Sequence, residues 1–76
     1  MNKTRRESLQ SIIDQLEELK ANLEDFQAEE EEYRDNMPEN LQASKKYEKA
    51  EDALSYLEDA TSTLEEVISS IKAAME

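Results

Sequence analysis

Apolar side chains recur every three or four residues through the first half of the chain, which is the spacing of one face of an α-helix. Cut into sevens from Leu9, this half reads LQSIIDQ, LEELKAN, LEDFQAE and EEEYRDN. With Leu9 as position a of the heptad, a narrow stripe occupies positions a and d and predicts a helix over about residues 4–35. The stripe consists of Leu9, Ile12, Leu16, Leu19, Leu23, Phe26, Glu30, Tyr33 and Met37.

The second half has a wider apolar stripe, which predicts a helix over about residues 41–75. From Ala50 it reads AEDALSY, LEDATST, LEEVISS and IKAAME, with positions a, d and e largely apolar and alanine frequent at d. A stripe of three positions in seven is typical of a helix that contacts two neighbours. We therefore predict that this helix forms a dimer seam through Leu54, Leu57, Leu64, Val67, Ile68 and Ile71.

Local signals predict where the helices begin and end. Thr4 and Glu7 have the S/T-x-x-E spacing of a capping box, which places the first helix start at Thr4. Pro38 is the only proline and breaks the pattern, so a linker is expected over about residues 36–40. Pro38 and Ser44 are both acceptable starts for the second helix. Such a short linker predicts one all-α domain, residues 1–76, folded as an antiparallel, coiled-coil-like helical hairpin.

Charged residues suggest the same antiparallel pairing. Folding about Pro38 would bring the acidic run 29–32 beside Lys45, Lys46 and Lys49. It would also bring the basic residues of the N-terminal segment, Lys3, Arg5 and Arg6, close to Glu76. Glu30, the one charged residue in the first stripe, either fixes the register of the helices or reaches Lys45 or Lys46, and we expect the second.

A hairpin of this size leaves apolar surface exposed, and this surface predicts self-association. A chain of 76 residues is near the lower limit for a single core that supports folding alone. Burial of one Leu or Ile side chain is worth about 1.5–3 kcal/mol, so exposed stripes favour association. We expect a homodimer in the form of a two-fold symmetric four-helix bundle.

Composition excludes many kinds of chemistry. The chain has 20 Asp and Glu against 9 Lys and Arg, a net charge of −11, and no Cys, His, Gly or Trp. It therefore has no thiol or imidazole for catalysis or for zinc binding, and we expect no enzyme activity, metal or cofactor. Its acidity argues against direct nucleic-acid binding, and no apolar run is long enough for a membrane span or a signal peptide. The expected location is the cytoplasm of a bacterial host.

Acidic doublets recur at positions b and c of both helices. In a bundle these positions face water, so one interpretation is a solvated surface that maintains solubility. The other is a row of carboxylates, with doublets about 10.5 Å apart, that binds a basic protein as a mimic of a polyanion. We call the doublets of the second helix the acidic ladder: Glu51, Asp52, Glu58, Asp59, Glu65 and Glu66.

The linker is flanked by Tyr33, Met37 and Tyr47. These side chains would either close the end of the hairpin as a small apolar plug or form a binding tip. Aromatic and Met residues bordered by charges are common in protein-recognition surfaces.

The linker region also resembles a known family. The stretch EEYRDNMPENLQ, residues 31–42, and the following YEKAE, residues 47–51, are similar to a family of small acidic proteins of unassigned function from phages, prophages and mobile elements of Firmicutes. The resemblance extends through most of the chain and implies a helical hairpin and a phage-type setting. It assigns no catalytic or ligand-binding residue. Small acidic phage proteins often act by covering a basic surface on a host or defence protein.

Three functions fit these observations. The first is a non-enzymatic interaction module that covers a basic surface on a host or defence protein, such as a nucleic-acid-binding enzyme. The second is a structural or assembly hairpin, for example a phage scaffolding or adaptor protein, in which the tip or the seam matters. The third is an antitoxin-like subunit that neutralises a basic toxin.

Overall fold

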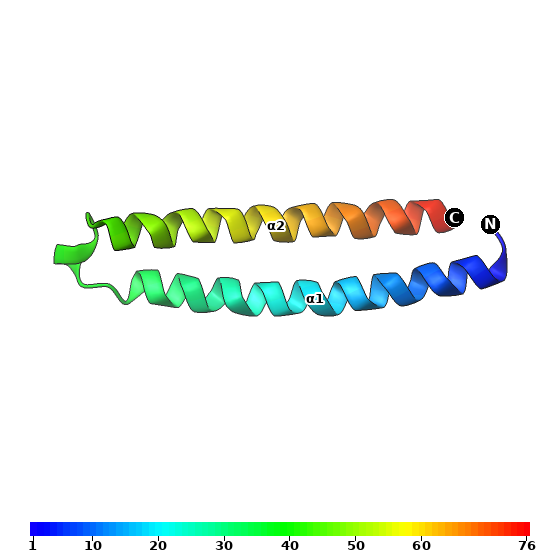
Figure 1. Ribbon diagram of the computed structural model, residues 1–76, viewed down its shortest axis with the longest axis horizontal. Coiled ribbons are helices and arrows are strands. Elements are labelled where there is room, and N and C mark those ends of the chain that lie inside the picture. The colour runs from blue at the N-terminus through cyan, green and yellow to red at the C-terminus, as the bar shows by residue number, and fades with distance from the viewer.

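The computed structural model describes residues 1–76 as two long antiparallel helices (Figure 1). Helix α1 spans Lys3–Asp35, the 3₁₀ turn η1 spans Glu39–Leu41, and helix α2 spans Lys45–Met75. The two termini lie near each other at one end, and the connection forms the other end (Figure 1). The predicted all-α helical hairpin is thus confirmed.

The hairpin is a rod and has almost no interior. Its Cα atoms extend over 59 × 15 × 12 Å with a radius of gyration of 17.4 Å. A compact domain of this length would have a radius of about 11 Å. Only five residues are buried, so almost every functional group of the chain lies on the surface.

The first helix starts at a different cap from the predicted one. Asn2 is the N-cap, because its backbone is extended and its side chain accepts a hydrogen bond of 2.7 Å from the backbone N–H of Arg5. Thr4 lies within the first turn, so the predicted capping box with Glu7 is wrong. Asn caps a helix as well as Thr does, and capping at Asn2 adds Lys3 and Thr4 to the helix.

The second helix begins at Lys45, later than the predicted residue 41, and Ser44 is its N-cap. The Ser44 hydroxyl oxygen accepts from the backbone N–H of Tyr47 at 3.3 Å, and the hydroxyl also donates to the carbonyl of Leu41. Pro38, with φ of −58°, precedes the short turn η1. The connection is therefore longer than the predicted 36–40.

Loss of this cap should be measurable. We expect Ser44→Ala to lower the free energy of unfolding by about 1 kcal/mol, because the N–H of Tyr47 loses its acceptor. Urea denaturation followed by circular dichroism would measure the change. Ser55→Ala, on an exposed turn within α2, is the matched control and should be neutral or slightly stabilising. An equal loss in both variants would contradict the capping role.

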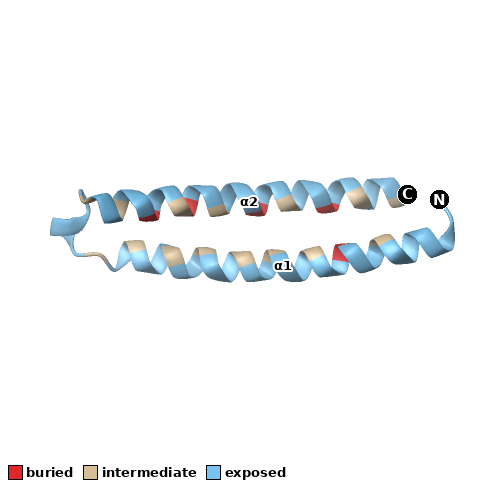
Figure 2. Ribbon diagram, viewed as in Figure 1, coloured by how far each residue is buried: buried red, intermediate tan, exposed pale blue.

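The helices meet through heptad positions a and e (Figure 2). The five buried residues all occupy these positions: Ile13, Ala50, Leu54, Thr61 and Ile68. The predicted stripe of α1 is therefore correct at position a and wrong at position d. At d, side chains of α1 remain about half exposed, with 44% for Ile12, 55% for Leu19, 60% for Phe26 and 52% for Tyr33.

The distribution of large side chains on α2 explains why the helices meet through positions a and e instead of a and d. Its position e carries Leu54 and Ile68, whereas its position d carries mostly alanine, so the bulk of α2 lies on its a and e side. The long side chain of Lys20 at e of α1 is only 26% exposed, and that of Arg34 is 27% exposed. Their aliphatic stems can cover the apolar side chains of α2 while the charged ends stay in water.

Candidate functional site

The use of positions a and e for the contact between the helices gives the hairpin two different faces. With a and e turned toward the other helix, d lies about 80° to one side and b about 80° to the other. The b side is the acidic face, whose glutamates come from both helices: Glu17, Glu24, Glu31, Glu51, Glu58 and Glu65. The d side is the apolar face: Ile12, Leu19, Phe26 and Tyr33 from α1, with Ala53, Ala60, Val67 and Ala74 from α2.

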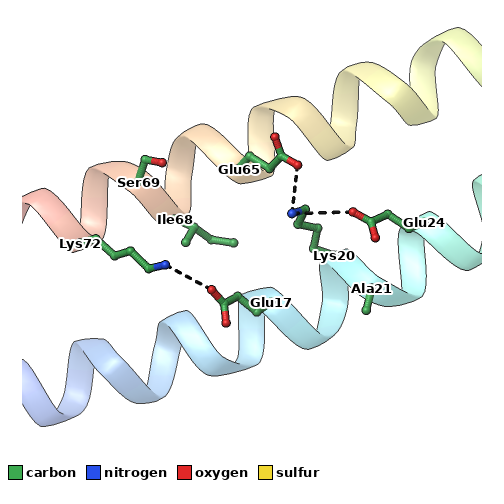
Figure 3. Close-up of a pocket in the computed structure, with 8 residues that line it drawn as sticks. All are labelled: Glu17, Lys20, Ala21, Glu24, Glu65, Ile68, Ser69 and Lys72. Carbon is green, nitrogen blue, oxygen red and sulfur yellow. Dashed lines mark hydrogen bonds and ion pairs between the residues drawn. The ribbon is translucent and has the colours of Figure 1, made fainter.

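An open groove of about 420 Å³ lies on the acidic face between the helices (Figure 3). Only two of its lining residues, Ala21 and Ile68, are apolar, and charged and polar side chains from both helices line the rest. Every lining residue occupies position b, e or f, which places the b positions of both helices on one side of the hairpin. The lining residues are Glu17, Lys20, Ala21, Glu24, Glu65, Ile68, Ser69 and Lys72.

Two lysines in this groove connect the helices. The Lys20 Nζ atom lies 3.0 Å from a carboxylate oxygen of Glu65 and 3.7 Å from one of Glu24 (Figure 3). The Lys72 Nζ atom lies 3.4 Å from Glu17. The hydrogen bond to Glu65 is the main cause that raises the pKa of the Lys20 ammonium above its usual value. The two lysines therefore neutralise part of the negative charge that lines the groove.

These contacts suit binding by charge more than chemistry. The groove is open to solvent, and its carboxylates lack the apolar enclosure that would prepare them for acid or base catalysis. No group of three or more carboxylates is placed to hold a metal ion. Neither helix contains an apolar stretch of the length that a bilayer crossing requires.

The structure places the acidic ladder along the outer side of α2. All of its residues are exposed, and Glu65 is the only one with an ion pair, to Lys20. Position b points to the acidic face and position c points away from α1. Most of the ladder is therefore available to a partner.

The ion pairs predicted near the connection are not formed. The two that join the helices are Lys20–Glu65 and Lys72–Glu17. No ion pair within 4.0 Å joins the acidic run 29–32 to a lysine of α2, and Lys3 pairs with Glu7 in its own helix. Glu30 is half-buried and reaches neither Lys45 nor Lys46, so that prediction is wrong.

The three residues proposed for the tip do not form one patch of equal exposure. Met37 and Tyr47 are half-buried near the end of the seam. Tyr33 belongs to the apolar face and is 52% exposed.

Arg34 pairs with the neighbouring Asp35 at 3.1 Å, and this hydrogen bond is the main cause that raises the pKa of the Arg34 guanidinium.

The residues assigned to the dimer seam differ in exposure and fall into three groups. Leu54 and Ile68 are 4% and 6% exposed within a single chain, which leaves little of their surface for a second one. The three position-a residues Leu57, Leu64 and Ile71 are half-buried in the same intrachain seam. Val67, at position d, is 42% exposed and lies on the apolar face.

Two features of the surface were not anticipated from the sequence. One is the lysine pair in the groove, and the other is the apolar face as a separate surface. The signal for both was present, because Lys20 occupies position e and the d residues are consistently large only in the first half. That signal can be interpreted only when positions a and e are assigned to the contact between the helices.

No family model matches the chain, and no curated protein or solved structure is significantly similar to it.

Proposed function

We propose that the protein is a non-enzymatic interaction module, a homodimer in the form of a four-helix bundle, that binds and covers a basic surface on a partner protein. The observation that supports this proposal is the separation of charge on the hairpin. Of the 20 carboxylates, Glu29 is the only one at position d or g in either helix. The others leave one face free of negative charge and concentrate it elsewhere.

The acidic ladder is the part of this surface best suited to a partner. Glu51, Asp52, Glu58 and Asp59 make no ion pair within the chain, so a partner's Lys or Arg would not have to displace an internal one. The doublets repeat about every 10.5 Å along a straight helix. A row of basic side chains on a partner, of the kind that binds nucleic-acid phosphates, would meet regularly spaced acceptors.

The setting of this proposal comes from the resemblance to small acidic phage proteins. It implies a basic host or defence protein as the partner and the bacterial cytoplasm as the location. Coverage of a nucleic-acid-binding enzyme would act by competition with its substrate. Electrostatic attraction would speed the encounter and make binding sensitive to salt.

A second candidate function is a structural or assembly hairpin. The exposed side chains of the apolar face favour it, because a row of four large residues is suited to packing against another helix. In that case the ladder would maintain solubility only.

Neutralising the ladder should distinguish these functions. We expect a variant with Glu51→Gln, Asp52→Asn, Glu58→Gln and Asp59→Asn to retain less than about a tenth of the partner captured from host lysate by the immobilised wild-type protein. Glu65 is left unchanged because it pairs with Lys20. Capture should fall between about 0.05 M and 0.5 M NaCl, and heparin, a polyanion, should release the captured protein.

The matched control changes the net charge equally on α1. It carries Glu18→Gln, Asp25→Asn, Glu29→Gln and Glu32→Gln, all at exposed positions outside the ladder. This variant should capture the partner nearly as well as the wild type. Equal loss of capture in both variants would show that binding depends on net charge and not on the ladder in particular. Full capture by the ladder variant would contradict the proposal.

A further inference from the structure

The apolar face is the largest feature of the molecule that the hairpin itself does not explain. Its four large residues on α1 are 44–60% exposed, and Val67 on α2 is 42% exposed. These side chains project beside the seam instead of into it. Monomeric proteins seldom expose a continuous apolar row of this length without a use for it.

Charge makes this face the one surface on which two copies can meet. Each copy has a net charge of −11, so contact between acidic surfaces would be repulsive. Positions d and g, which form the apolar face and its rim, carry only Glu29 and Lys49 between residues 8–33 and 49–74. The rest of the rim is neutral: Ser8, Gln15 and Asn22 on α1, and Tyr56, Thr63 and Ser70 on α2.

The sizes of the side chains make this face complementary to itself. The α1 column is large, with Ile, Leu, Phe and Tyr, whereas the α2 column is mostly alanine. The Gln27 and Thr61 side chains are in contact across the seam, so the large column of α1 and the small column of α2 run side by side along the hairpin. The heptad step repeats both columns along the face, and Val67 is the one larger residue in the α2 column.

The area of the face is sufficient for a stable dimer. Over the 31 residues of α2, about 46 Å at 1.5 Å per residue, and the 15 Å width of the hairpin, the face covers roughly 700 Å² per copy. Stable specific interfaces bury about 800 Å² per partner, with a wide range. A chain that buries five residues by itself would gain most of its core from this contact.

We propose that two copies pack apolar face to apolar face with α1 of each over α2 of the other and with both connections at the same end. This arrangement rests on the homodimer of the proposed function and specifies its surface and orientation. A two-fold axis parallel to the helices produces it, and each large column then lies over a small one. An axis perpendicular to the helices would place the two large columns over each other and the connections at opposite ends.

The first test measures mass by sedimentation equilibrium. The wild type should have twice the 8.8 kDa mass of the chain, and a monomer at micromolar concentration would overturn both the homodimer and this inference. Leu19→Glu with Phe26→Glu should weaken dimerisation about 100-fold or more, because the new charges would be buried between the copies. A dimer unaffected by these changes would place the contact on another face while leaving the homodimer intact.

The matched control adds the same two charges to the opposite side of α1. Ala21→Glu with Ala28→Glu, at exposed f positions, should leave the dissociation constant within about threefold of the wild-type value. Circular dichroism of both variants reports whether the helices are retained. Loss of helix only in the Leu19 and Phe26 variant, with recovery at high protein concentration, would still support the contact.

Orientation is tested in an otherwise wild-type chain, which has no cysteine of its own. Asn40→Cys places a spin label in the connection. We expect label-to-label distances of roughly 15–30 Å if the connections share one end. Distances approaching the 59 Å length of the hairpin would overturn this orientation and favour the perpendicular axis.

Discussion

Leu54→Ala is expected to lower the free energy of unfolding by about 2–4 kcal/mol. The Leu54 side chain is 4% exposed and lies at position e of α2, turned toward α1. Only four apolar residues of the chain are buried, so few other contacts can compensate for the cavity. A single core of this size supplies only about 3–5 kcal/mol, and the variant should therefore lose most of its stability.

The measurement is urea denaturation followed by circular dichroism, at one fixed protein concentration because association would add to the apparent stability. Leu41→Ala is the matched control, since it removes the same atoms from a side chain that is 44% exposed in the connection. We expect it to cost less than about 1 kcal/mol. Similar losses in the two variants would show that the seam does not pass through Leu54.

The sequence was sufficient to predict the elements because their signals are local. A 3.6-residue period over some 30 residues has no alternative interpretation in a chain with a single proline. The predicted end of α1 at residue 35 and of α2 at residue 75 agree with the structure. The starts were less accurate. Asn2 and Thr4 are both good caps for α1, and of the two starts left open for α2, Pro38 and Ser44, the structure has Ser44 as the N-cap.

The face that each helix turns to the other could not be predicted in the same way. On α1, position d is consistently large and apolar, and position e contains Lys20, Gln27 and Arg34 after Ile13. From the sequence of α1 alone, positions a and d would therefore be expected to face α2. The large e residues of α2 determine the outcome, and α1 meets them with long polar side chains whose stems are apolar. Such a choice depends on both helices at once.

The register was also outside the reach of local reasoning. Folding the chain symmetrically about Pro38 places the lysines 45, 46 and 49 beside the acidic run. In the structure α1 ends at Asp35 and α2 begins at Lys45, nearly level with each other (Figure 1), so the chain folds about residue 40 instead of Pro38. No ion pair joins these lysines to the acidic run. The added residues of the connection, up to the cap at Ser44, permit this shift.

The register also leaves Glu30 in an unfavourable place, which leads to the second large effect. Glu30 occupies position a and is half-buried in the seam, yet it has no ion pair and follows Glu29 in an acidic run. Substitution by leucine should raise the free energy of unfolding by about 1–2 kcal/mol, since apolar surface replaces a partly desolvated carboxylate. For a domain of this size the melting temperature should rise by about 4–8 °C per kcal/mol.

Glu32→Leu separates this effect from a general loss of negative charge. Glu32 is exposed at position c of the same run, so both variants lower the charge of the run by one. The control should change stability by no more than about 0.5 kcal/mol, whereas Glu30→Leu should stabilise. An equal gain in both would attribute the effect to charge repulsion within the run. A loss on Glu30→Leu would show that the carboxylate makes a stabilising contact in solution, which would return the acidic run to a role in pairing the helices.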